Sequence, residues 1–214
     1  MDRGEYLDRW SQLHGGVTPT GVIGGWLRLN HALGRPLVRL GVPPDVITLT
    51  GLGLAVLVLP SAAGGGRWPL LAVATIVLAA LMDSLDGAVA VLSGRISRRG
   101  AVLDGACDRL ADTCFIAALG LAGAPIGWCL AGGLVAMLHE QVRAGARVAG
   151  MQEVGVVTVS ERPTRVILTA MFLLGAGLYP GSAGEWASAG ASAWTVIGIA
   201  GFAQLCVVVA RRLA

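Results

Sequence analysis

Aspartates are concentrated in the most apolar part of this 214-residue sequence, where acidic side chains are unusual. An aspartate at the centre of a membrane-spanning helix costs about 2.5–3.5 kcal/mol on insertion scales, so such residues are functional by default. Placement within or at the edges of apolar stretches therefore predicts a functional cluster. The six aspartates placed in this way are Asp45, Asp83, Asp86, Asp104, Asp108 and Asp112.

The spacing of these aspartates predicts a metal site. Asp83 and Asp86 are three residues apart and share one face of a helix, and Asp104 and Asp108 are four apart on the next apolar segment. A ligand set of carboxylate oxygens favours a hard cation such as Mg²⁺, Mn²⁺ or Ca²⁺. Four carboxylates from two helices suit a pair of ions about 3.5–4 Å apart, the arrangement that holds attacking and leaving oxygens in phosphoryl chemistry. Asp112 continues the second stripe as a further ligand, as a partner of Arg109 or as a capping residue.

Small residues and arginines accompany the acids. Gly87, Ala90 and Gly100 leave room for a bulky ligand to approach the backbone. Arginines between the two acidic segments are suited to phosphate oxygens. These are Arg95, Arg98 and Arg99.

The acidic run resembles the CDP-alcohol phosphotransferase signature. That signature reads D-x-x-D-G-x-x-A-R, then eight or nine residues, then G-x-x-x-D-x-x-x-D. The one departure is Val91, which stands where the family usually has Arg. The matching positions are Asp83, Asp86, Gly87, Ala90, Gly100, Asp104 and Asp108.

The resemblance extends beyond the signature. Residues 41–48 look like the family's opening element, and 141–147 and 161–165 are similar to the end of its fourth span and the start of its fifth. Within the family, the chain most resembles actinobacterial phosphatidylinositol phosphate synthases, with phosphatidylglycerophosphate synthases a close second. Arg143 matches the first of two basic residues in the fourth span of the inositol-phosphate enzymes, and Gly145 replaces the second. The acceptor therefore stays open.

The resemblance implies a reaction and a set of site residues. A CDP-linked lipid, CDP-diacylglycerol or another CDP-alcohol, gives its phosphatidyl group to a small polar or phosphorylated alcohol, and CMP leaves with the help of two Mg²⁺ or Mn²⁺ ions. Asp83, Asp86 and Asp104 resemble the family's metal ligands, and Asp108 matches the general base, which also contacts metal. The implied nucleotide-binding residues are Asp45, Thr48, Gly87, Ala90 and Gly100, and the implied acceptor-binding residues are Arg143, Arg162, Arg165 and Arg212.

The composition predicts an all-α integral membrane protein. Hydrophobic residues make up 55% of the chain and charged residues 14%, with a mean hydropathy of +0.71. These values exclude an ordinary soluble globule and a disordered chain, and a net charge of +3 does not suggest a nucleic-acid-binding protein. The four cysteines lie in apolar stretches and are expected to be buried hydrophobic residues.

Six apolar stretches are long enough, or nearly long enough, to span a bilayer as helices. Residues 1–40 are expected to form a cytoplasmic, interfacial segment, and residues 41–214 to form the membrane domain. Within the first segment, residues 17–40 are expected to form one or two short amphipathic helices that Pro36 breaks or kinks. Gly190, Gly198 and Gly201 are expected to pack helices, and a homodimer is expected. The expected spans are residues 46–63, 68–92, 101–122, 126–148, 165–179 and 192–210.

Arginine positions predict the orientation. The arginines that flank the six spans fall on one side, and the opposite side has only Arg67. The positive-inside rule therefore places both termini and the active site in the cytoplasm, at a bacterial-type inner or plasma membrane. An aromatic belt is expected at the outer interface, formed by Trp68, Trp128, Tyr179, Trp186 and Trp194.

Two alternative functions use the same residues. A divalent-cation transporter would also need intramembrane carboxylates, but transport sites lie near the midplane and the acids here all fall in the cytoplasmic half. A family member impaired by Val91 would keep the fold and lose turnover. Metal-dependent release of CMP from CDP-diacylglycerol separates the enzyme from the transporter, and an unchanged rate in Val91→Arg would count against the impaired family member.

Overall fold

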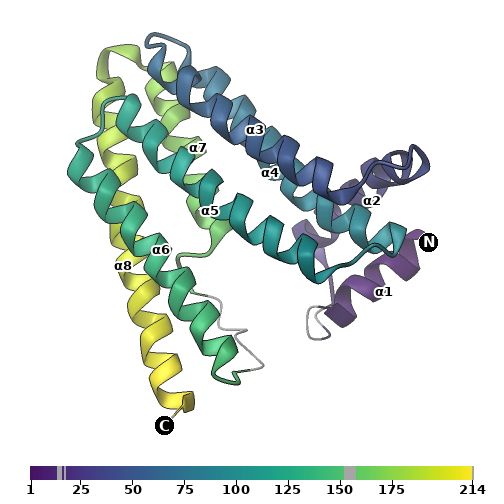
Figure 1. Ribbon diagram of the computed structural model, residues 1–214. Helices are drawn as coiled ribbons and strands as arrows, with labels where there is room; N and C mark the ends of the chain where they lie inside the picture. The colour runs from purple at the N-terminus through teal and green to yellow at the C-terminus, as the bar shows by residue number, and fades with distance from the viewer. Residues whose placement is uncertain (14–15, 17, 152–157, 214) are drawn as a thin grey trace. The chain divides into compact units, whose positions relative to one another are not determined.

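A computed structural model describes residues 1–13, 16, 18–151 and 158–213 of the chain (Figure 1). Over these residues the fold is all-α, as expected, with one short 3₁₀ helix and no strand. The elements are α1 (Arg3–Leu13), α2 (Gly21–Arg39), α3 (Pro44–Ala63), α4 (Pro69–Ser93), α5 (Arg98–Leu121), α6 (Ile126–Val148), α7 (Arg162–Leu178), η1 (Pro180–Ser182) and α8 (Ala183–Leu213).

Three segments among the described residues are long and apolar enough to cross a membrane: Pro44–Ala63, Pro69–Ser93 and Pro180–Leu213. The chain is therefore a membrane protein, and three of the six expected spans meet this criterion. The other three expected spans correspond to α5, α6 and α7. Helix α5 carries the acidic stripe, α6 is polar toward its C-terminal end, and α7 has 17 residues.

The N-terminal segment is more helical than expected. Helix α1 occupies a polar stretch for which the hydrophobic pattern predicts no helix. Helix α2 continues through Pro36, and the amide of Leu40 donates to the Pro36 carbonyl at 3.0 Å. Of the two expectations for Pro36, a break or a kink, the break is therefore wrong. The helix ends at Arg39, and Gly41, just beyond the C-cap residue Leu40, has a φ of +73° that suits a residue without a side chain.

The chain forms two compact units. The first comprises Met1–Leu54 and Leu78–Asp108, and the second comprises Ala55–Val77 and Arg109–Ala214. Helices α3, α4 and α5 each contribute residues to both units. The division into residues 1–40 and 41–214 stays a prediction.

In the first unit, α2 packs against the C-terminal half of α4. Tyr6 of α1, Leu27 of α2 and Ala88 of α4 form one apolar cluster. A Cβ atom at Gly34 would lie 3.0 Å from Leu92 Cδ1, so the absence of a side chain lets the two helices approach closely. Trp26 Nε1 donates to Ser84 Oγ at 3.0 Å and adds a polar contact between the same helices.

In the second unit, glycines bring the helices close together. A Cβ atom at Gly132 of α6 would lie 2.9 Å from Trp194 Cδ1, and one at Gly190 of α8 would lie 2.7 Å from Phe172 Cβ. Gly198 and Gly201 also face neighbouring side chains at short range. These contacts agree with the packing role expected of the three α8 glycines, as small residues allow close helix approach in membranes.

One expected member of the aromatic belt is placed differently. Trp194 is 1% exposed and packs within the second unit, so its assignment to an interfacial belt is wrong. The space beside Gly132 accommodates its ring. The other expected belt residues, Trp68, Trp128, Tyr179 and Trp186, are exposed.

Replacing Gly190 by Ala is expected to lower the stability of the second unit by about 1–3 kcal/mol, since the new methyl group would overlap Phe172 Cβ. Thermal unfolding of the purified protein in detergent measures the change. Gly127→Ala in α6 is the matched control, because a Cβ atom there meets nothing within 4 Å. Equal melting temperatures for Gly190→Ala and the native protein would contradict the packing role.

Candidate active site

The turn between α4 and α5 brings their acidic segments to the same level. Gly94 has a φ of +68°, and the amide of Arg95 donates back to the Ala90 carbonyl at 3.0 Å, which closes the end of α4. Ser97 Oγ accepts the amide of Gly100 at 2.9 Å and caps the start of α5. The chain therefore reverses within a few residues. Aspartates placed shortly before and shortly after the turn face each other.

Three aspartates converge in this way. The carboxylates of Asp83, Asp104 and Asp108 each offer an oxygen, and the three oxygens lie within 4.8 Å of one another. All three residues are partly buried. Oxygen donors at this separation fit a hard divalent cation such as Mg²⁺ or Mn²⁺. The geometry of these three predicted ligands therefore agrees with a metal site.

Asp86, the fourth predicted ligand, is positioned by α3, a helix that carries none of the four predicted metal ligands. Its side chain is 6% exposed, and Oδ2 accepts a hydrogen bond of 2.5 Å from Thr48 Oγ1 on α3. Thr48 also donates to the carbonyl of Pro44 at 3.2 Å. Thr48 thus holds the Asp86 carboxylate one helical turn from Asp83.

The predicted nucleotide-binding residues lie around the same part of the first unit. A Cβ atom at Gly100 would lie 3.7 Å from Asp45 Oδ1, so the starts of α5 and α3 are close together. Gly87 is exposed, and a Cβ atom there would meet nothing within 4 Å. Ala90 is partly buried. The space beside Gly87 fits the expectation that a ligand approaches the backbone at this point.

Val91, at the position where the signature has Arg, takes part in apolar packing. It lies against the cluster of Tyr6, Leu27 and Ala88 that joins α1, α2 and α4. Its side chain therefore contributes to the docking of the N-terminal helices.

The predicted acceptor-binding arginines belong to the second unit, where three of them lie near carboxylates. Arg143 of α6 makes a two-pronged ion pair with Glu161, with distances of 2.6 Å and 3.1 Å. Arg162 Nε lies 3.8 Å from Asp112 Oδ1. Arg212 is exposed in the last turn of α8.

Arg165 is the most enclosed of these arginines, with 1% of its surface exposed. Its Nη2 lies 2.9 Å from Asp112 Oδ2 and 3.1 Å from Glu140 Oε1, and its Nη1 donates to the Ser160 carbonyl at 3.0 Å. Glu140 also accepts from Arg109 at 3.1 Å. Arg165 therefore joins α5, α6 and α7 in one ion-pair network.

Thr158, which the sequence patterns did not single out, lies beside the Arg143–Glu161 pair. Thr158 donates its amide and its hydroxyl to Glu161 Oε1 at 2.8 Å and 2.9 Å, and its hydroxyl lies 3.1 Å from His139 Nε2. Burial raises the pKa of the Glu161 carboxyl, but hydrogen bonds from Arg143 and Thr158 outweigh burial and hold the pKa below its usual value. Glu161 is therefore a charged partner that orients Arg143.

Comparison with known proteins places these features in a family. Residues 42–206 match the model of the CDP-alcohol phosphatidyltransferase family. A phosphatidylinositol phosphate synthase of Mycobacteroides abscessus is 34% identical over 183 residues, which are 79% of this chain and 80% of that protein.

Solved structures agree with the sequence comparison. The crystal structure of Mycobacterium tuberculosis phosphatidylinositol phosphate synthase with CDP-DAG bound has a TM-score of 0.67 and 26% identity, and covers 85% of this chain and 94% of that one. The structure of the same enzyme with manganese and citrate has a TM-score of 0.66 and covers 84% and 88%. With a family match over residues 42–206 and relatives of this kind, the chain belongs to the CDP-alcohol phosphatidyltransferase family and is a CDP-alcohol phosphotransferase.

Proposed function

We propose that this enzyme transfers the phosphatidyl group of CDP-diacylglycerol to a small alcohol and releases CMP. The observation that carries the proposal is the convergence of carboxylate oxygens from Asp83, Asp104 and Asp108 within 4.8 Å. The comparison structure with CDP-DAG bound supports this donor. The family assignment favours this reaction over transport of divalent cations.

The proposed reaction consists of one bond formed, one bond broken and one proton transfer. The acceptor oxygen bonds to the phosphorus that carries diacylglycerol, and the bond from that phosphorus to the bridging pyrophosphate oxygen breaks. The proton of the acceptor hydroxyl passes to the Asp108 carboxylate, and CMP leaves with the bridging oxygen. A carboxylate is a weak base for an alcohol, so Asp108 would need the help of a metal ion or of a buried environment.

The remaining aspartates would hold the divalent ions. Asp83, Asp86 and Asp104 would be the ligands together with Asp108, and Thr48 would orient Asp86 through its hydroxyl. A bound pair of Mg²⁺ or Mn²⁺ ions would neutralise the pyrophosphate and stabilise the departing CMP. The manganese in a related structure supports a divalent metal.

The nucleotide would lie over the small residues of the first unit. Gly87 has open space beside it, and Gly100 and Ala90 add little bulk. Asp45 and Thr48 at the start of α3 complete the proposed nucleotide-binding set.

The acceptor would be an anionic alcohol held by arginines. The proposed residues are Arg143, Arg162, Arg165 and Arg212, and the names of the relatives make inositol phosphate the first acceptor to test. Arg143 already pairs with Glu161, so a phosphate would compete with this carboxylate. Arg165 is enclosed between Asp112 and Glu140, and its contribution would be to position the neighbouring arginines.

The proposed setting is a bacterial-type inner membrane, with the site and both termini in the cytoplasm. Six spans, an interfacial segment over residues 1–40 and a homodimer form part of the same proposal. The three long apolar helices support the membrane setting, and the one-sided distribution of arginines supports the cytoplasmic position of the site and the termini.

Asp108→Asn is expected to reduce turnover by about 10²–10⁴-fold, because the amide cannot accept the acceptor proton. Release of labelled CMP from CDP-diacylglycerol, measured with saturating Mn²⁺ and inositol phosphate, checks this. Asp8→Asn removes the same charge from an exposed position of α1 and should keep native turnover. Native turnover in Asp108→Asn would remove the base assignment.

Removal of divalent ions by a chelator is expected to stop CMP release, and Mg²⁺ or Mn²⁺ should restore it. Because a cation that binds the folded state stabilises it, Mn²⁺ should also raise the melting temperature. Asp83→Asn and Asp104→Asn should lose that rise, while Asp8→Asn should keep it. Full activity in excess chelator would end the metal-dependent account.

Glu161→Gln is expected to destabilise the protein by about 1–3 kcal/mol at pH 7, because Arg143 loses a charged partner in a half-buried position. The folded-state pKa of Glu161 is lowered, so its contribution is present above the ordinary pKa of 4.5 and is lost as the pH falls toward the folded value. Melting temperatures of the two proteins should therefore converge in acid. A gap that persists unchanged at pH 3 would argue against the ionic origin.

A further inference from the structure

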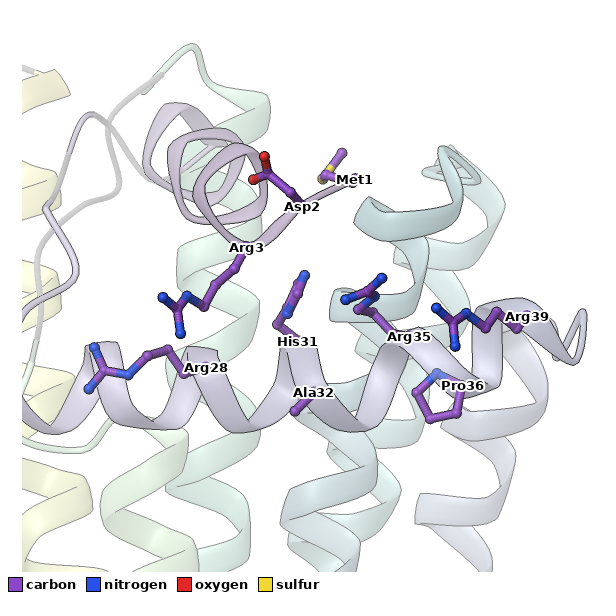
Figure 2. A pocket seen from close by; sticks show the side chains of 9 residues that line it. All are labelled: Met1, Asp2, Arg3, Arg28, His31, Ala32, Arg35, Pro36 and Arg39. Carbon is purple, nitrogen blue, oxygen red and sulfur yellow. The ribbon is translucent and has the colours of Figure 1, made fainter.

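An open pocket of about 730 Å³ lies between α1 and α2 in the first unit. None of the residues that line it takes part in the proposed transfer reaction. Figure 2 shows α2 running along one side of the pocket and the start of α1 on the other. The residues that matter for its chemistry are Asp2, Arg3, Arg28, His31, Arg35 and Arg39.

The pocket is strongly cationic. Arg28, Arg35 and Arg39 are separated by seven and four residues, so they form one stripe along α2. Arg3 extends from α1 toward this stripe (Figure 2). The only carboxylate among the lining residues is Asp2, and its Oδ1 accepts the amide of Glu5 at 2.9 Å. Four guanidinium groups therefore surround a space that a single, already engaged carboxylate does not neutralise.

A buried histidine lies between these arginines. His31 is 6% exposed, and within the described part of the chain its Nε2 has no hydrogen-bond partner. The ring centroids of Tyr6 and His31 are 5.5 Å apart. Since Tyr6 also packs against Leu27 and Ala88, the position of α1 over His31 is set by apolar contacts. The pocket is thus a built feature of the first unit.

The opposite stripe of α2 shows where the pocket opens. Trp26, Leu29 and Leu33 are exposed apolar residues, and helical spacing places them on the side away from Arg28, Arg35 and Arg39. In a membrane protein, such an apolar stripe faces lipid while the basic stripe faces water. The pocket therefore opens toward water.

We propose that this pocket binds a water-borne, phosphate-bearing anion. A phosphate group has several oxygens and up to two negative charges, and arginine forks bind such groups through paired hydrogen bonds. Arg3 on one side and the α2 stripe on the other would hold the same phosphate. Binding would join α1 to α2 and slow the opening of α1.

The test uses the full chain in phosphatidylcholine nanodiscs, with inorganic phosphate as the probe. Hydrogen exchange of the α1 amides is measured against phosphate concentration, which localises binding to this pocket. Phosphate should slow exchange saturably in the native protein. In the double variant Arg28→Gln, Arg35→Gln, the phosphate concentration that gives half-maximal protection should be at least about tenfold higher, since two charge-assisted contacts are lost.

Arg9→Gln is the matched control, because Arg9 is an exposed arginine of α1 that does not line the pocket. It should respond as the native protein does. Unchanged exchange of α3 and α4 amides in the double variant confirms that the unit is folded. Equal phosphate dependence in the native and double-variant proteins, or no protection of α1, would overturn the proposal.

A second arm separates the source of the phosphate. Nanodiscs that contain phosphatidylglycerol are compared with phosphatidylcholine nanodiscs in the absence of free phosphate. A water-borne ligand predicts no protection of α1 by the anionic lipid. Protection by phosphatidylglycerol alone, with no effect of inorganic phosphate, would show that a lipid headgroup is the ligand and would overturn the assignment to a soluble anion.

Discussion

Electrostatic repulsion must be overcome wherever carboxylates are held as close together as those of Asp83, Asp104 and Asp108, whose oxygens lie within 4.8 Å of one another. The first unit has the means to hold them. The turn at Gly94 aligns the end of α4 with the start of α5, and α2 packs along α4 over an apolar cluster. A divalent cation would relieve the same repulsion, which links the stability of this unit to the proposed chemistry.

The second unit relies on close backbone approach and on compensated charge. Gly132 and Gly190 allow neighbouring helices to pack tightly, as suits a protein whose helices meet in an apolar surrounding. Arg165 is almost fully enclosed and is tolerated because Asp112 and Glu140 lie beside it. The first role of Arg165 is therefore structural, since its ion pairs connect α5, α6 and α7. With 1% of its surface exposed, Arg165 would affect ligand binding through the neighbouring side chains that it positions.

Local patterns predicted much of the candidate site because they depend on helical spacing. The pairs Asp83–Asp86 and Asp104–Asp108 each needed only one helix, and the short turn at Gly94 joined the two. Helical spacing does not show which residues from different helices contact each other. Thr48 as the partner of Asp86 and Glu161 as the partner of Arg143 are contacts between residues far apart in the chain. The hydrophobic pattern also failed for α1, whose polar stretch is held by Tyr6 packing on α2 and α4.

The sequence by itself determined the helical class, the membrane setting and the signature of the family, since composition and spacing along one helix carry this information. The tertiary structure decided the roles of individual side chains. Trp194 is a core residue instead of an interfacial one, Pro36 lies within a continuous helix, and Val91 is a contact for the N-terminal helices. The physical reason is that burial and pairing depend on the neighbours that helix packing supplies, and these neighbours come from distant parts of the chain.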